Sequence, residues 1–280
     1  MIRNLFLPTI CCLLLLSSLS SLSSCKDPAD TDDGTGFAGM SVEDNNAPTF
    51  NRMNIHPPTK KNAFVPAPLT DVKGTYGIDV SKYQKTIDWQ QVIDDTSEGK
   101  ITFVVHKATE GVTYLDPNFK QNFADSKRYK LKSGAYHFFK QQRKAADQAK
   151  QFIKNVQLDA NDLPPVLDIE PGCVKCKDVE LPLKTLIKGL QTWIEIVEKQ
   201  YGKRVIIYTT ERYYSRYLKG NFPNNTFWIA KYNQTPPETL LLPHTEAERA
   251  TIWQYTHKGK VNGIEGFVDL NFTAEDVSKW

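Results

Sequence analysis

The sequence predicts an α/β fold, a modified TIM-like barrel in which five β/α units are followed by three strands with few helices. Short apolar runs alternate with amphipathic stretches from Thr75 onward, a pattern typical of parallel strands joined by right-handed crossovers. Eight such runs fit in roughly 200 residues, the size of one barrel domain. With 40% hydrophobic and 24% charged residues, the composition excludes collagen-like, coiled-coil and wholly disordered chains.

The apolar runs place the expected strands at Tyr76–Val80, Ile101–Lys107, Lys132–Phe138, Pro165–Glu170, Arg204–Thr209, Phe227–Lys231, Thr251–Tyr255 and Phe267–Asn271. Several of them are almost continuously apolar, as strands buried on both faces should be. Helical patterns separate the first five strands, at Trp89–Ser97, Pro117–Lys130, Arg143–Val156 and Pro182–Tyr201. The last helix is the clearest, with a one-sided apolar face and Gly202 as its stop.

Residues 1–24 are predicted to form a lipoprotein signal peptide. Arg3 precedes an apolar stretch, Leu5 to Leu16, which is too short for a membrane span of about 20 residues. The stretch ends in Leu22-Ser23-Ser24-Cys25, which resembles a bacterial lipobox. We therefore expect a lipidated Cys25 that anchors the protein to a lipid bilayer of the cell envelope; the alternative is an ordinary signal peptide with Cys25 as a bystander.

Residues 25–71 are predicted to form a disordered tether. Six acids and one lysine lie between Lys26 and Asn46, and five prolines follow in residues 45–70, a composition with too little apolar surface to fold. An acidic segment after a lipidated cysteine resembles the export signal of surface lipoproteins, although a spacer facing the periplasm has the same composition. Residues 72–280, the expected catalytic barrel, hold 30 basic and 25 acidic residues, too balanced for a nucleic-acid partner.

A pair of acids ends the fourth predicted strand. Asp168 and Glu170 are two residues apart, so they share one face of the strand with α-carbons about 6.5–7 Å apart. Like charges this close raise the pKa of at least one carboxyl. Glycosidic cleavage needs such a pair, a proton donor and an anion. The structural alternative is an Asp and a Glu that cap the following helix.

Two further acids lie in the first and last predicted strands, Asp79 and Asp269. In a closed barrel these strands are neighbours, so both acids are expected to face Asp168 and Glu170 across the mouth. Stability alone does not explain four converging acids, because burying unpaired charge is costly.

The folded part of the chain resembles glycoside hydrolase family 25, the lysozymes that cleave peptidoglycan. The resemblance runs from about Tyr76 to the C-terminus and rests on the order and spacing of many short motifs. They include Gly77-Ile78-Asp79-Val80-Ser81, residues 103–111, Asp116-Pro117-Asn118-Phe119, Gly134-Ala135-Tyr136-His137-Phe138, Leu167-Asp168-Ile169-Glu170, Trp228-Ile229-Ala230, Trp253-Gln254-Tyr255 and residues 263–271.

The resemblance implies an N-acetylmuramidase that cuts the β-1,4 bond from N-acetylmuramic acid to N-acetylglucosamine in the peptidoglycan glycan strand. By it, Glu170 is the general acid, Asp168 holds or polarises the 2-acetamido group, and Asp79 and Asp269 complete an acidic floor. Either the acetamido carbonyl or a water molecule attacks the sugar. Two carboxylates on one strand favour the acetamido route, since no enzyme nucleophile reaches the opposite face of the sugar.

Aromatic and polar residues near strand ends are the candidates for substrate binding. Sugars would stack on Tyr136, Tyr208 and Trp228, with Gln254 and Lys107 as polar partners. The alternative is that such aromatics fill the core, and we expect this for Phe138 and Trp253. For Lys107 the alternative is a salt bridge to a floor carboxylate.

Cys173 and Cys176 lie in the loop after Glu170, where an oxidising envelope favours a disulfide between them. No metal-ligand spacing, nucleophile triad or phosphate loop occurs, so the sequence predicts neither a metal nor a cofactor. His106 and His137 are expected to be satisfied strand residues. Two alternative functions stay open: a catalytically silent sugar-binding lipoprotein, and a barrel hydrolase of other N-acetylglucosamine polymers such as chitin.

Overall fold

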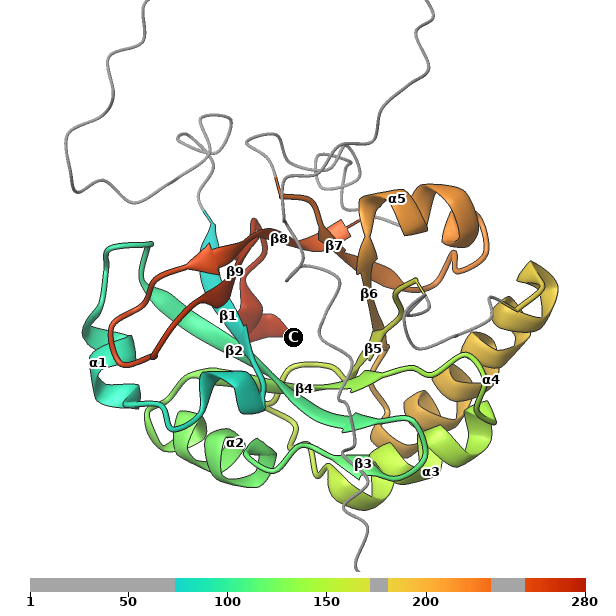
Figure 1. Cartoon of the computed structure of the whole chain (residues 1–280), viewed down its shortest axis with the longest axis horizontal. Helices are drawn as coiled ribbons and strands as arrows, with labels where there is room; N and C mark the ends of the chain where they lie inside the picture. The colour runs from blue at the N-terminus through green and yellow to red at the C-terminus, as the bar shows by residue number, and fades with distance from the viewer. Residues whose placement is uncertain (1–73, 172–180, 233–249) are drawn as a thin grey trace, which may run out of the picture. The chain divides into compact units, whose positions relative to one another are not determined.

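The computed structural model describes residues 74–171, 181–232 and 250–280. Their strands form one sheet in the order β1-β9-β8-β7-β6-β5-β4-β2, with β3 added beside β2. Because β1 also pairs with β2, the eight strands from β1 to β2 close into a barrel (Figure 1). The predicted fold class is confirmed.

The strands lie close to their predicted positions, at β1 Thr75–Val80, β2 Ile101–Glu110, β4 Lys132–Phe138, β5 Val166–Asp168, β6 Ile206–Thr210, β7 Thr226–Ala230, β8 Ala250–Gly259 and β9 Val268–Thr273. β5 is shorter than expected, so Glu170 lies just beyond its end. The two-residue strand β3, Tyr114–Leu115, was not predicted; it pairs antiparallel with the end of β2.

The last strand, β9, runs in the opposite direction to the one predicted. Strand–helix alternation predicts parallel strands throughout. Seven barrel strands run parallel, whereas β9 is antiparallel to both β8 and β1. A short connection, residues 260–267, joins β8 to β9 and leaves no room for a crossover helix. The start of β9 therefore lies beside the end of β1, at the edge where the parallel strands end.

Four helices connect the first five barrel strands, α1 Trp89–Asp94, α2 Phe119–Arg128, α3 Ala145–Asn155 and α4 Leu183–Tyr201. The Asp88 side chain caps α1 by accepting hydrogen bonds from the backbone of Gln90 and Gln91. α4 ends at Gly202, whose φ of 64° suits the left-handed cap conformation. After β6 the helix α5, Glu211–Tyr213, continues directly into a π-helix, Tyr214–Leu218, a pair that the sequence pattern did not predict.

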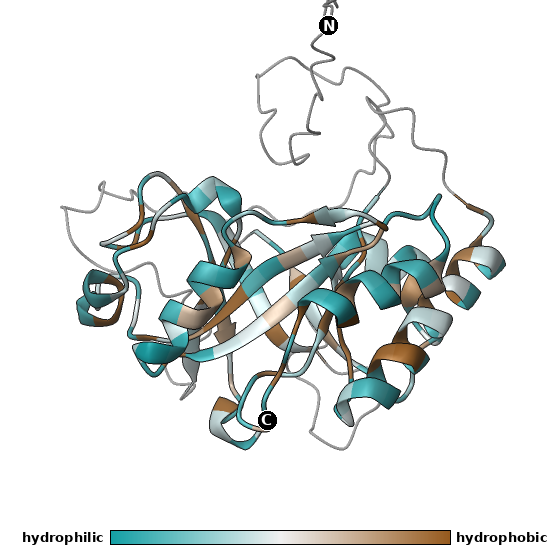
Figure 2. Ribbon diagram, turned by 90° about the horizontal axis from the view of Figure 1, so that it is seen from below, coloured by the Kyte–Doolittle hydropathy of each residue, from teal (hydrophilic) through white to brown (hydrophobic). Residues whose placement is uncertain are grey.

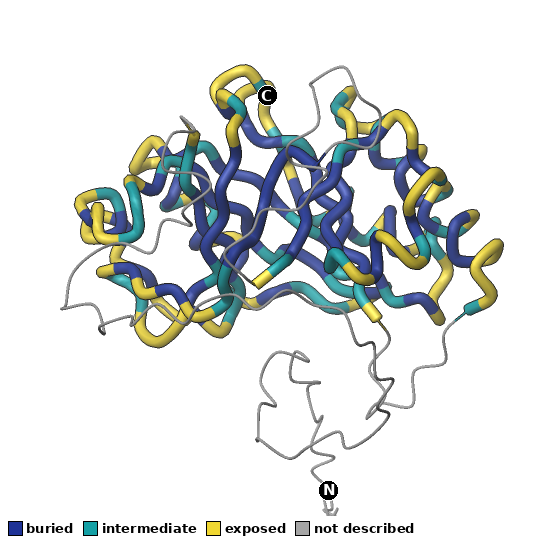
Figure 3. The backbone as a smooth tube through the Cα atoms, turned by 90° about the horizontal axis from the view of Figure 1, so that it is seen from above, coloured by how far each residue is buried: buried dark blue, intermediate teal, exposed yellow. Residues whose placement is uncertain are grey.

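The core has two parts, one on each side of the barrel wall. Inside the barrel pack residues such as Phe103, Val105, Val166, Ile206 and Ile252. Between strands and helices a larger cluster includes the inner face of α4, with Leu190 and Trp193 fully buried. The strands are accordingly dark blue in Figure 3, and the helices of Figure 2 carry both hydrophilic and hydrophobic stretches. None of the described helices combines the length and apolar character needed to cross a bilayer.

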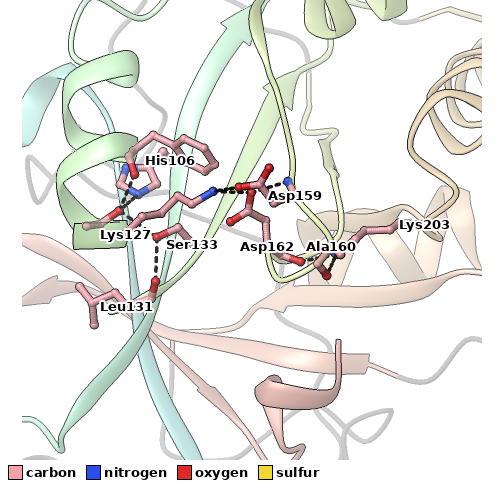
Figure 4. Close-up of polar contacts among 10 residues, drawn as sticks. His106, Lys127, Leu131, Ser133, Asp159, Ala160, Asp162 and Lys203 are labelled. Atoms are coloured by element: carbon pink, nitrogen blue, oxygen red, sulfur yellow. Dashed lines mark hydrogen bonds and ion pairs between the residues drawn. The ribbon is translucent and has the colours of Figure 1, made fainter. Parts of the chain in front are cut away.

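An ion-pair cluster fixes the loop that leads into β5 (Figure 4). The Lys127 ammonium on α2 contacts the carboxylates of Asp159 at 2.7 Å and Asp162 at 2.8 Å. Lys203 donates hydrogen bonds to the carbonyl oxygens of Ala160 and Asp162. Because Asp162 is buried, these contacts hold the loop at the end of the barrel where the parallel strands begin.

Candidate active site

The carboxyl ends of the parallel strands bring the predicted acids together. Asp168 is the last residue of β5 and is 6% exposed, whereas Glu170 follows the strand and is half-buried. Asp168 is the register partner of Phe138 on β4 and Tyr208 on β6, so the three side chains face the same side of the sheet.

Asp79 and Asp269 meet because β9 is antiparallel. They are directly paired across β1 and β9, and directly opposed residues of antiparallel strands point to the same face with Cβ atoms about 5 Å apart. Asp79 is 8% exposed and Asp269 is half-buried. The sequence predicted that Asp79 and Asp269 would be neighbours because the barrel closes, and the structure has this closure. The antiparallel direction of β9 places the two acids directly opposite each other.

A side-chain network holds Asp79 in one position. Its Oδ2 accepts hydrogen bonds from Gln254 Nε2 at 2.9 Å and from Asn271 Nδ2 at 2.8 Å. The indole Nε1 of Trp228 donates to Asn271 Oδ1 at 2.9 Å, which fixes the orientation of that amide. Two N–H donors on one carboxylate oxygen favour its anion, so the network stabilises Asp79 as a negative charge.

Two tyrosines complete the network. The hydroxyls of Tyr208 and Tyr232 both donate to Gln254 Oε1, at 2.9 Å and 2.6 Å. An amide oxygen that accepts two hydroxyl protons leaves its nitrogen pointing to Asp79. Asn271 and Tyr232 were not among the predicted site residues; the signal for Tyr232 was its place directly after a parallel strand.

The pKa values of the two tyrosines respond to burial and to the acids around them. Burial raises the pKa of Tyr208 well above its usual value, and the carboxylates of Glu170, Asp168 and Asp79 raise it further. Burial also raises the pKa of Tyr232, with further contributions from Asp269, Glu170 and Asp79. Each of the four acids therefore acts on this tyrosine pair, and both phenols stay protonated at ordinary pH.

The structure divides the predicted sugar-binding residues into two groups. Trp228 is 1% exposed and packs edge-on against Tyr208, with ring centroids 4.8 Å apart; the expectation that its ring face stacks on a sugar is wrong, because the ring is buried in the barrel. Gln254 is 2% exposed, and its amide is engaged by Asp79 and the tyrosines. Both residues therefore position other groups.

Tyr136 and Lys107 lie on the neighbouring wall of the barrel. They are register partners on β4 and β2, and Tyr136 packs half-buried against the inner core. The Lys107 ammonium contacts Glu110 Oε2 at 2.9 Å. Among the core expectations, Trp253 is fully buried as predicted, whereas Phe138 is half-buried with the Lys107 and Lys140 ammoniums over its ring.

The two strand histidines are buried and hydrogen-bonded away from the acids, but only His137 is satisfied as predicted, since His106 Nδ1 has no hydrogen-bond partner among the described residues. His106 Nε2 lies 3.0 Å from Ser126 Oγ, and His137 contacts Thr109 and Gln148. Burial lowers the pKa of His106 to about 3 and that of His137 to about 4. Both imidazoles are therefore neutral at ordinary pH.

A cavity of about 540 Å³ lies at the other end of the barrel, lined by the starts of β1, β2 and β4 and by Asp162 and Asp276. It holds none of the four predicted catalytic acids.

Three predictions lie outside the described residues: the signal peptide, the tether with Cys25, and the disulfide between Cys173 and Cys176.

Comparison with known families agrees with this geometry. The sequence profile of glycosyl hydrolases family 25 matches residues 78–264, a span that contains Asp79, Asp168 and Glu170. The chain belongs to this family. It is therefore a glycoside hydrolase, as the sequence resemblance implied.

Individual relatives support the assignment of this family 25 hydrolase. YegX of Escherichia coli strain K12 is 36% identical over 216 residues, covering 76% of this chain and 74% of YegX. Lysozyme M1 of Streptomyces globisporus is 31% identical over 214 residues, covering 72% of this chain and 68% of that protein. A solved family 25 glycosyl hydrolase from Bacillus anthracis has a TM-score of 0.64 and 36% identity, covering 74% of this chain and 92% of that one.

A bacterial lysozyme from Streptomyces coelicolor also has a TM-score of 0.64, with 29% identity over 75% of this family 25 hydrolase and 96% of that structure. The barrel fold is thus shared with a solved structure that carries the name lysozyme.

Proposed function

We propose that the protein is a peptidoglycan muramidase that cleaves the β-1,4 bond between N-acetylmuramic acid and N-acetylglucosamine. The observation that carries the proposal is the placement of four acids where the parallel strands end: Asp79 is paired with Asp269 across β1 and β9, Asp168 ends β5, and Glu170 lies just beyond it. Membership of family 25 and the similarity to Lysozyme M1 and to the Streptomyces coelicolor lysozyme support it.

Glu170 is the general acid in this proposal. It lies just beyond β5 and is half-buried, and the adjacent carboxylate of Asp168 disfavours a second negative charge. A protonated carboxyl at this place donates its proton to the glycosidic oxygen as the bond to the leaving N-acetylglucosamine breaks.

Asp168 orients the 2-acetamido group of the muramic acid. As the glycosidic bond breaks, the acetamido carbonyl oxygen bonds to C1 and the positive charge of the resulting oxazolinium ion is stabilised by Asp168. Water then adds to C1 with Glu170 taking its proton, which opens the ring and restores the acetamido group. Each face of the sugar is attacked once, so the β configuration is retained.

The experiment measures new reducing ends released from purified peptidoglycan by the wild-type protein and by Glu170→Gln. We expect muramic acid at the reducing ends, and about a 10³-fold or larger loss in Glu170→Gln because general acid catalysis contributes 10²–10⁴-fold. Glu195→Gln, the same change on the exposed face of α4, is the matched control. Absence of turnover by the wild type would contradict the proposal and favour a silent sugar-binding protein; glucosamine ends would favour a hydrolase of other polymers.

The anomeric form of the first product separates the two routes of attack. Proton NMR within the first minutes of reaction should show the β-anomer of the muramic acid product. The α-anomer would mean direct attack by water from the opposite face.

The cellular location is a second part of the proposal. The Leu22-Ser23-Ser24-Cys25 sequence and the acidic segment that follows it favour a lipid-anchored protein of the cell envelope. Labelling with palmitate tests this part. We expect the wild type to incorporate the label and Cys25→Ala to lose it, whereas the control Cys173→Ala, a change at the disulfide candidate, should keep it. Equal labelling of both variants would contradict it.

A further inference from the structure

Three ammonium groups gather over two aromatic rings beside the acidic floor. The Lys107 ammonium lies 4.8 Å from the Phe138 ring centroid and 5.9 Å from that of Tyr114. Lys140 lies 5.0 Å from the Phe138 centroid, and Lys82 lies 5.5 Å from the Tyr114 centroid. We call Lys82, Lys107, Lys140, Tyr114 and Phe138 the lysine wall.

The backbone explains why these side chains share one face. A register shift between Lys107 and Thr109 in the β2–β4 pair inserts an extra residue, and such a bulge re-aims the side chains around it. As a result Lys107 is paired with Tyr136, and Glu110 with Phe138. Tyr136 and Phe138, two residues apart on β4, face the same side.

Glu110 organises the wall without covering it. Its Oε2 contacts Lys107 at 2.9 Å and its Oε1 contacts Lys140 at 3.1 Å. Burial acts to raise the pKa of Glu110, but the charges of Lys107 and Lys140 lower it overall. The side chain of Lys140 is 25% exposed, and an ammonium has three N–H donors, so its contact with Glu110 leaves donors for a ligand.

Lysines outnumber acids at the wall, whereas the floor is acidic. The floor holds four acids on β1, on β9 and at the end of β5, while the three lysines of the wall lie beside two acids, Glu110 and Asp116. The Asp116 carboxylate is buried and accepts hydrogen bonds from the backbone N–H groups of Lys82 and Asn118. A floor of this kind suits the positive charge of a glycosidic transition state, and the wall suits an anion.

The position of the wall matches one part of the substrate. Phe138 is the register partner of Asp168, and Lys107 lies one strand further along, so the wall begins about 5–10 Å from Asp168 at a strand spacing of about 4.8 Å. In muramic acid the acetamido group is on C2 and the lactyl ether on the adjacent C3. When the acetamido group lies at Asp168 and C3 is directed toward β4 and β2, the lactyl substituent lies over the wall.

We propose that the lysine wall binds a carboxylate carried by the 3-O-lactyl substituent of the muramic acid. The inference rests on the proposed muramidase function and names the group that selects muramic acid over plain N-acetylglucosamine. Two sources supply such a carboxylate, the lactyl group itself in peptide-free strands and the stem peptide in peptide-bearing strands. Charge-assisted hydrogen bonds from ammoniums already held by Glu110 and the rings provide the recognition.

The test compares kcat/KM on matched glycan strands. Peptide-free strands with a free lactyl carboxylate are assayed against the same strands converted to the amide, and peptide-bearing strands against their amidated form. We expect the wild type to prefer one acidic preparation about tenfold, a value typical of one charged hydrogen bond. The pair that shows the preference identifies the source of the carboxylate.

Lys140→Gln should reduce that preference to about twofold or less, because it removes one donor cation. Lys150→Gln, on the exposed surface of α3 with its ammonium 3.8 Å from Asp147, is the matched control and should keep the wild-type ratio. Thermal melting of both variants verifies folding, and Lys82→Gln is a second variant at the wall.

Equal cleavage of acidic and amidated strands by the wild type would overturn the inference while leaving the proposed function standing. A preference that Lys140→Gln and Lys82→Gln both preserve would also overturn it. If no strand is cleaved, the proposed function fails, and calorimetric binding of acidic against amidated strands then tests the wall alone; equal affinities would overturn it.

Discussion

Gln254 donates a hydrogen bond from Nε2 to Asp79 Oδ2 at 2.9 Å, while its own carbonyl oxygen accepts from two tyrosine hydroxyls. This arrangement links β8, β1, β6 and Tyr232, the second residue after β7, through one buried amide. Asp79 is therefore an anion that accepts hydrogen bonds from neutral amide donors.

Replacing Gln254 by Met removes a donor to Asp79 and keeps the side-chain length. We expect kcat/KM to fall by roughly 10–100-fold, because a hydrogen bond to a charged group contributes about 1.5–3 kcal/mol. The ascending limb of the pH–rate profile should move to higher pH, since the anion of Asp79 loses one of its two amide donors. An unshifted profile with an unchanged rate would show that Asp79 does not depend on Gln254.

Trp228→Phe tests the support of Asn271. The change keeps a buried aromatic ring but removes part of the indole, including the Nε1–H that donates to Asn271 Oδ1. The matched control is Trp253→Phe, whose Nε1 donates to the backbone oxygen of Lys231 instead. Both variants should lose about 1–3 kcal/mol of unfolding free energy, from the cavity and the lost hydrogen bond, but only Trp228→Phe should lower kcat; equal kcat values would contradict a role for Trp228 in the site.

The buried histidines predict a loss of stability in mild acid. In the folded state the pKa of His106 is about 3 and that of His137 about 4, below the unfolded value of about 6.5. The contribution of the two neutral histidines to the free energy of unfolding is complete above pH 6.5. It is lost as the pH falls, because the unfolded chain then binds protons that the folded chain does not.

Between pH 7.5 and pH 5 each histidine should therefore remove about 2 kcal/mol from the free energy of unfolding. Urea denaturation across this range measures the slope. His106→Gln should be less stable at pH 7.5 but show a shallower decline; a slope equal to that of the wild type would contradict the assignment of His106.

Lys127→Met tests the ion-pair cluster that fixes the loop before β5. It leaves the carboxylate of Asp162, whose side chain is 3% exposed, without its cation. We expect a loss of about 1–3 kcal/mol, below the value for a fully buried pair because Lys127 is itself partly exposed. Arg128→Met removes a contact of an exposed guanidinium with Asp125 and should change the melting temperature little; equal shifts in the two variants would contradict the account.

Periodicity and strand–helix alternation predicted the barrel, and strand ends located Asp79, Asp168, Glu170 and Asp269, because these depend on local sequence. The reversal of β9 was missed, since the sequence pattern of a six-residue strand does not show its direction. Tyr232 and Asn271 were missed because their roles depend on which side chains from β8, β1 and β7 meet at Asp79. The burial of Trp228 has the same cause, since ring exposure depends on the curvature of the closed sheet.

The most direct test of Glu170 as the general acid is the dependence of Glu170→Gln on the leaving group. The substrates are a natural muramic acid–N-acetylglucosamine oligosaccharide and a dinitrophenyl glycoside of the same muramic acid unit, whose phenolate leaves without protonation. The account predicts that Glu170→Gln loses at least about 10³-fold on the natural bond and less than about tenfold on the dinitrophenyl glycoside. Equal losses on both substrates would contradict it.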